Sequence, residues 1–282
     1  MSGVSGHYEI TKRAVQELLR EMPRDFIVQR LGIDYAYAEP STNDYNRQWF
    51  LDGPHRNMVI KIGGEVGAEK VDPWKPGFTH DHEFLVEMCR VTQNPADGSV
   101  CMDLHDLIDG EHWVDTDDSQ RHHFMRASHS SIERAYSCAV DWIWQNTTIA
   151  SVNLAARWRK FGGQSMNAWG IPSKAMGAAV HCLQDSFSGS HVRREGLTAA
   201  TPGWITAIYV YSEQKASDHA IDDKAWLDKK TKDFSAHGRH AIEATKELLR
   251  MTVRAAEGTG VVLEHSPEWK KFCQTWLALK PS

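Results

Sequence analysis

The segment GAAVHCLQDSFSGSH, residues 177–191, limits the folds open to this chain more than any other feature of the sequence. His181 and Asp185 are four residues apart, so a helix would place an imidazole and a carboxylate on one face, a turn apart. Gly189 allows that helix to end, and His191 can then turn back toward the same centre. The segment predicts a metal site at a helix end, and the alternative is a surface hydrogen bond between His181 and Asp185.

Two other regions carry residues of the same chemistry. His219 and Asp223 repeat the four-residue spacing, although this acidic stretch also fits a helix start that stabilises its dipole. His122 and His123 are adjacent and point apart on any regular element, so one can bind a metal while the other supports it. His7 opens the first helical segment and would by itself be an ordinary surface residue. Imidazole and carboxylate donors without thiolate suit zinc in a hydrolytic site.

Apolar residues follow helical spacing along much of the chain. With 282 residues, of which 41% are hydrophobic, the chain can bury a core as one large domain or two small ones. Residues 204–211 fit a short strand or a buried helical turn. We expect an all-α fold, a single domain over 1–282 with an irregular insertion at about 60–120. The expected helices cover residues 10–20, 83–91, 130–146, 150–160, 174–188, 218–230, 236–254 and 267–278.

Charge and cysteine content restrict the partners and the compartment. A formal charge of −5 argues against a broad electrostatic grip on nucleic acid. The five cysteines are scattered and form no CxxC pair, which indicates reduced thiols. The first ten residues lack the basic start and apolar core of a secretory signal. We therefore expect a cytoplasmic protein or one exported by a leaderless route, which would include delivery as a toxin or effector.

Taken together, the pattern resembles the zinc-dependent phospholipase C superfamily, which also contains the single-strand-specific nucleases of fungi and plants. The shared features are a histidine leading a helix, HxxxD, a histidine six residues on, and a distal HxxxD. They span most of the chain, from His7 to Asp223, and "HCLQDSFSGSH" is their most specific part. The stretch "LQDSFSGSHVRRE" looks closer to bacterial phospholipases than to nucleases. The resemblance implies a bundle of helices wrapped around a multinuclear zinc site.

The resemblance also implies about three zinc ions per chain and a set of ligands for each ion. In the family, the third site takes the amino-terminal residue, usually tryptophan, five positions before the histidine. Here that position is Ser2, which removal of Met1 would expose. The implied ligands are His123, His181, Asp185 and Asp52 for the first zinc, His191, His219 and Asp223 for the second, and Asp185, His7 and Ser2 for the third.

Asp52 is the aspartate that the resemblance assigns to the first zinc and to catalysis, as base or orienting group for the attacking water. The family keeps this aspartate closer to the next histidine, so other acidic residues compete for the role. These rivals are Asp109, Asp115, Asp117 and Asp118. Phe124 could pack on a substrate head group or base, and its alternative is a core aromatic. Arg126 could bind phosphate, as could Arg193 and Arg194, with solvated arginines as the alternative.

The function implied is a zinc-dependent phosphodiester hydrolase. The leading prediction is a phospholipase C that cleaves glycerophospholipids such as phosphatidylcholine to diacylglycerol and a phosphorylated head group, with transient contact to a membrane surface. One alternative is a nuclease for single-stranded DNA or RNA, in which Phe124 would stack on a base. Net acidity and the lack of paired cysteines argue against it, and no stable nucleic-acid partner is expected. The other alternative is a non-catalytic helical protein with structural metal.

Overall fold

The computed structural model describes residues 6–21, 115–161, 171–213, 226, 233–258, 261–262 and 264–281. This part of the chain is mostly helical, with one two-stranded sheet, which confirms the predicted fold class at this level. The single domain stays a prediction, and the insertion expected at about 60–120 lies outside the described residues except at its end, from residue 115. The elements are α1 (Gly6–Glu21), α8 (Asp117–Gln120), η3 (Arg121–His123), α9 (Ile132–Phe161), α10 (Ile171–Asp185), β1 (Val192–Glu195), β2 (Trp204–Ile208), η4 (Tyr211–Glu213), α12 (Ala236–Glu257) and α13 (Pro267–Trp276).

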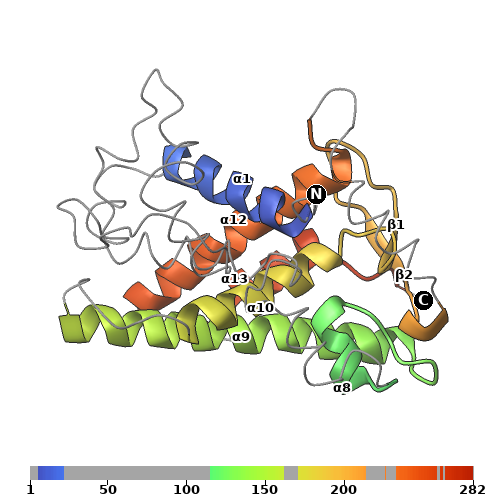
Figure 1. The fold of residues 1–282 in the computed structure, drawn as a ribbon, viewed down its shortest axis with the longest axis horizontal. Helices are drawn as coiled ribbons and strands as arrows, with labels where there is room; N and C mark the ends of the chain where they lie inside the picture. The colour runs from blue at the N-terminus through green and yellow to red at the C-terminus, as the bar shows by residue number, and fades with distance from the viewer. Residues whose placement is uncertain are drawn as a thin grey trace, which may run out of the picture.

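Helix α9 is the base on which the other long helices assemble. It packs against α10 and α12, and α1 lies on α12 (Figure 1). Small side chains at the α9 surface, including Ala135 and Ala139, are fully buried, as is Ala179 on α10. Because alanine has no side chain beyond Cβ, two helices that meet through it can approach closely. The core therefore lies between α9, α10 and α12.

Helix α9 runs without interruption through a region predicted to separate two helices, at 130–146 and 150–160. The polar side chains of this region form hydrogen bonds to backbone carbonyls of the same helix. Asn146 Nδ2 donates to Trp142 O (3.0 Å), and Thr147 Oγ1 donates to Ile143 O (2.7 Å). Such bonds to the preceding turn let asparagine and threonine remain inside a helix. The predicted break is therefore wrong, and one helix replaces two.

The other predicted helices differ from the structure mainly at their ends. The expected spans 10–20, 174–188, 236–254 and 267–278 correspond to α1, α10, α12 and α13. Helix α10 ends at Asp185, earlier than predicted, and turns of the chain follow it. The predicted helices at 83–91 and 218–230 lie outside the described residues, apart from Trp226.

The sheet is a hairpin that fixes the chain after α10. Strands β1 and β2 are antiparallel, with Val192 opposite Ile208 and an irregularity between Arg193 and Arg194. Of the two readings of residues 204–211, the strand is correct for Trp204–Ile208. Ile205 also bonds through its backbone to Ala278 and Lys280, so the hairpin holds the carboxyl-terminal segment. Among the described residues, no helix is both long and apolar enough to cross a lipid bilayer.

An ion cluster holds α1 in place on α12. The Lys246 side chain is only 3% exposed and its amine contacts Glu17 at 3.4 Å and Glu21 at 2.5 Å, both on α1. It also contacts Glu243 on its own helix at 3.0 Å. Arg250 adds a second contact to Glu21. These pairs join the two helices along one edge and so set the position of the residues at the start of α1.

Candidate metal centre

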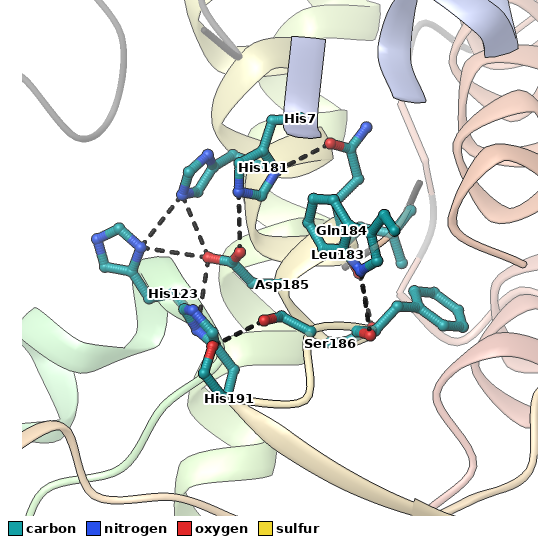
Figure 2. Close-up of polar contacts among 12 residues, drawn as sticks. His7, His123, His181, Leu183, Gln184, Asp185, Ser186 and His191 are labelled. Carbon is teal, nitrogen blue, oxygen red and sulfur yellow. Dashed lines mark hydrogen bonds and ion pairs between the residues drawn. The ribbon is translucent and has the colours of Figure 1, made fainter. Parts of the chain in front are cut away.

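Asp185 lies at the centre of a buried group of four histidines. Its side chain is 1% exposed. The histidines come from separate parts of the chain: the start of α1, the end of η3, the last turn of α10 and the loop before β1 (Figure 2). They are His7, His123, His181 and His191. The structure therefore brings together each predicted site histidine that lies in the described residues.

One oxygen of Asp185 forms a close triangle with two imidazoles. Oδ2 lies 3.2 Å from His123 Nδ1 and 3.2 Å from His181 Nε2. The two nitrogens are 3.1 Å apart. Zinc–nitrogen and zinc–oxygen bonds of about 2.0–2.1 Å in a tetrahedron separate the ligand atoms by about 3.3–3.4 Å. The triangle is therefore close to the size that a tetrahedral metal ion requires.

The other oxygen of Asp185 faces His7. Oδ1 lies 3.1 Å from His7 Nε2, and the His7 ring stacks on the His181 ring with centroids 4.2 Å apart. One ligand atom each from His7, His181 and Asp185 lie within 4.8 Å of one another, all three residues being buried. This cluster can hold a metal ion.

His191 approaches the same carboxylate from the loop after α10. Its Nδ1 lies 3.7 Å from Asp185 Oδ2 and 2.5 Å from the carbonyl oxygen of His123, to which it donates. A histidine that gives one ring hydrogen to a carbonyl presents its other nitrogen as the ligand, a common arrangement at metal sites. The bond also ties the loop of His191 to η3, which carries His123.

A left-handed residue aims His123 at the cluster. Phe124 has φ 52°, a backbone angle that residues other than glycine seldom adopt. Its N–H bonds to Arg121 O and the N–H of Met125 bonds to Gln120 O, the paired bonds of a Schellman motif. Glycine is the usual residue at this position of the motif, and here a fully buried phenylalanine occupies it. Core packing of Phe124 offsets the unfavourable backbone and ends η3 directly after His123.

The histidines determine the charge state of Asp185. Burial alone raises the pKa of this carboxyl, but the neighbouring His191, His181 and His7, together with the hydrogen bond from His123, hold it well below its ordinary value. Asp185 is therefore an anion at neutral pH and can bind a cation. Next to it, burial and the charge of Asp185 raise the pKa of Cys182 well above its ordinary value. Cys182 stays a thiol that donates to Arg121 O at 3.1 Å, so the donors of the site are nitrogen and oxygen.

The remaining predicted ligands lie outside the part of the chain that is described. They are Ser2, Asp52, His219 and Asp223, together with the rival Asp109. The three rivals that are described have other partners. Asp115 bonds to Ser128, Asp117 accepts from Ser130 Oγ at 2.8 Å, and Asp118 pairs with Arg121 at 3.0 Å. These aspartates stabilise the α8 region, and the assignment of Asp52 stays a prediction.

The two residues predicted to contact substrate, Phe124 and Arg126, make contacts within the fold. Phe124 is fully buried and packs edge-on against Tyr136, which fits its alternative interpretation as a core aromatic. Arg126 donates to the backbone carbonyls of Ile208 (2.8 Å) and Ser130 (3.1 Å). Substrate contact by Phe124 would require it to leave the core.

Sequence reasoning missed Gln184, the residue directly before Asp185. Its side-chain oxygen contacts His7 (Figure 2). Its side-chain nitrogen contacts two threonines, one on α1 and one on α12. Its position three residues after His181 was a weak signal, because a glutamine at a helix end has many ordinary roles.

Comparisons of the chain with protein-family models, characterised proteins and solved structures give no match.

Proposed function

We propose that this chain is a zinc-dependent phosphodiester hydrolase whose substrate is a glycerophospholipid. The observation that carries the proposal is the position of Asp185, whose two oxygens face different imidazoles. Oδ2 faces His123 and His181, and Oδ1 faces His7. A carboxylate with a separate set of nitrogen donors at each oxygen is suited to bridge two metal ions.

The donor set supports zinc as the metal. Imidazole and carboxylate bind zinc readily, and the described cluster contains no thiolate that would favour a closed structural site. The separations of 3.1–3.2 Å within the triangle fit ligands that surround a small ion. Hard ions such as Ca²⁺ prefer six to eight oxygen donors, which this histidine-rich cluster does not supply.

The chemistry of the substrate follows from the charge of the site. A phosphodiester is an anion, and attack on it increases the charge on its oxygens. Metal ions in such a site neutralise this charge and lower the pKa of a water that can act as the nucleophile. The chain itself contributes the ionised Asp185, whose negative charge would offset the repulsion between neighbouring metal ions. It also contributes histidines whose orientation is set by hydrogen bonds to backbone and side-chain groups. His191, for example, is held by its bond to His123 O.

The net charge and the core motif favour the lipid over the nucleic acid. Phe124 was a candidate contact to a head group or to a base, and because it is fully buried it does not separate the two substrates. The net charge of −5 is unfavourable for a nucleic-acid groove. A phospholipase requires only a transient approach to a membrane surface, and the sequence around the site resembles bacterial phospholipases. The structural-metal alternative makes a different prediction, since it allows metal without hydrolysis.

The test measures metal content and hydrolysis on the same preparations. Wild-type protein and Asp185→Asn are analysed for zinc by elemental analysis and assayed on phosphatidylcholine vesicles and on single-stranded DNA. The matched control is Asp141→Asn, which alters a partly buried aspartate of α9 outside the cluster. We expect about three zinc ions in the wild type and the control, with release of the phosphorylated head group, and loss of both in Asp185→Asn.

Each other outcome selects a different conclusion. Cleavage of DNA without cleavage of lipid would replace the phospholipase with the nuclease. Bound zinc that depends on Asp185, with neither substrate cleaved, would favour the structural role. No bound zinc in the wild type would end the proposal.

A further inference from the structure

Gln184 joins three helices through a buried set of polar side chains. It is fully buried at the end of α10. Its Oε1 lies 3.0 Å from His7 Nδ1, and its Nε2 lies 2.9 Å from Thr11 Oγ1 and 3.2 Å from Thr245 Oγ1. His7 and Thr11 are one turn apart on α1, so Gln184 holds that helix at two points. Thr245 belongs to α12.

Counting hydrogens along this network determines which way the amide faces. Thr245 Oγ1 donates its single hydrogen to the carbonyl of Ala241 at 2.7 Å. The same oxygen can therefore only accept from Gln184, so the amide nitrogen faces Thr245 and Thr11. The amide oxygen then faces His7. Because an amide oxygen only accepts, the hydrogen of this bond is on His7 Nδ1.

This arrangement has a consequence for the other nitrogen of His7. In a neutral imidazole with hydrogen on Nδ1, Nε2 carries a lone pair. That lone pair faces Asp185 Oδ1, 3.1 Å away. An imidazole nitrogen and a carboxylate oxygen at this distance are joined either by a proton on Nε2 or by a metal ion, and a metal ion that binds here displaces the proton.

We propose that Gln184 is a positioning residue that fixes the tautomer of His7, so that Nε2 and Asp185 Oδ1 together bind one metal ion. The inference deepens the proposed function and rests on it. Outer partners of this kind orient metal-binding histidines and typically change metal affinity about 10- to 100-fold when they are replaced. Thr11 and Thr245 in turn hold the amide of Gln184, which makes α1 and α12 part of the same site.

The first experiment measures zinc affinity by competition with a chromophoric chelator, on full-length protein. Gln184→Met keeps the length of the side chain and removes the acceptor, and we expect one zinc ion to bind about 10- to 100-fold more weakly. Gln184→Glu keeps an acceptor for His7 but loses the donor to Thr11 and Thr245, so it should recover only part of the affinity that Gln184→Met loses. An equal loss in both variants would mean that the glutamine acts only through packing, and the inference would be wrong.

A pair of threonine variants provides the matched control on α12. Thr245 and Thr252 are both buried, and each donates to the carbonyl four residues earlier. Thr252, however, contacts the sulfur of Met176, and no contact of it with Gln184 is described. Thr245→Val should lower the affinity for the same zinc ion by about tenfold, while Thr252→Val should leave this affinity unchanged. Equal zinc affinity in the two variants would contradict the role of the network.

Nitrogen NMR gives a readout that activity and folding do not. In zinc-loaded wild type, long-range ¹H–¹⁵N spectra should show His7 with hydrogen on Nδ1 and metal on Nε2, and His7→Asn should remove these signals and so assign them. Hydrogen on Nε2 would overturn the inference directly. The two proposals fail separately: a wild type without zinc refutes the proposed function, whereas a wild type with zinc and an unaffected Gln184→Met refutes only the inference.

Discussion

Replacing Arg194 should lower the free energy of unfolding far more than replacing its neighbour Arg193. Arg194 lies in β1, shortly after His191 of the histidine cluster, and its guanidinium makes four hydrogen bonds. Nε donates to Ser186 O (2.7 Å), Nη1 to Pro202 O (3.2 Å), and Nη2 to both Ser186 Oγ (3.1 Å) and Trp276 O (2.9 Å). It also lies over the ring of Phe187, 4.1 Å from its centroid. Burial lowers the pKa of Arg194 to about 9, so the group remains charged at neutral pH.

The size of the effect follows from these contacts. In Arg194→Met the carbonyls of Ser186, Pro202 and Trp276 lose their donor. The guanidinium is enclosed by these partners, whereas the residue as a whole is half-buried, so the cost for each carbonyl that loses its donor lies near the lower end of about 1–3 kcal/mol. The lost interaction with the Phe187 ring adds about 0.5–2 kcal/mol. We expect a loss of about 3–5 kcal/mol in the free energy of unfolding. Arg193 is exposed and donates only to Thr206 Oγ1 among the described contacts of its side chain, so Arg193→Met should change it by less than about 0.5 kcal/mol.

The assay is urea and thermal denaturation of the two variants at one fixed zinc concentration, because bound metal stabilises the folded state. For a chain of this size the expected loss corresponds to a fall of roughly 6–20 °C in Tm. Arg194→Lys should recover only part of it, since an ammonium cannot reproduce the planar set of donors. If the Arg194→Met and Arg193→Met midpoints coincide, Arg194 does not hold the loop after Asp185, and the reasoning is refuted.

Two further predictions concern charge in the described core. Because the histidines hold the pKa of Asp185 well below its ordinary value of 3.8, the ionised carboxyl stabilises the fold fully above about pH 5, and this contribution is lost as the pH falls through 3.8 toward the folded pKa. Urea midpoints measured with a chelator should therefore decline more steeply with acid in the wild type than in Asp185→Asn, and parallel curves would contradict this. Lys246→Met should lower the free energy of unfolding by about 1–2 kcal/mol, because the Lys246 side chain is 3% exposed but those of its partners Glu21 and Glu243 are 44% and 47% exposed. Arg254→Met, which breaks only exposed pairs, should have an effect below about 0.5 kcal/mol, and equal effects in urea denaturation would show that the Lys246 cluster adds nothing.

The helices were predictable where apolar residues repeat with helical spacing, and their ends were less so. The two helices expected at 130–146 and 150–160 form one helix, in which Thr147, between the two expected spans, bonds to the carbonyl four residues earlier. The end of η3 was also hidden, since a phenylalanine occupies the left-handed position where glycine is expected. In both cases a side-chain contact decides the local structure, and spacing alone does not reveal it.

The part of the site within one helix was predictable from spacing, and the part between helices required chemistry. Four residues of helix bring His181 next to Asp185, so their proximity follows from local geometry. His7 and His123 reach the same carboxylate only through the packing of α1 and η3 on α10. They could be proposed beforehand because few residue types commonly bind metal ions, and a resemblance to a known family connected these histidines with Asp185.

Gln184 shows why the second layer of such a site escapes prediction. Glutamine and threonine occur everywhere in proteins, so neither Gln184 nor Thr245 stands out in the sequence. Their role depends on where one hydrogen lies: the bond from Thr245 to Ala241 fixes the amide of Gln184, and the amide fixes the ring of His7. A substitution of Thr245 on α12 should therefore change metal binding at Asp185 on α10, through Gln184 and His7 and not through a contact between Thr245 and Asp185. The metal ligands can be recognised by their chemistry, whereas the residues that orient them can be recognised only from the hydrogen bonds of the folded chain.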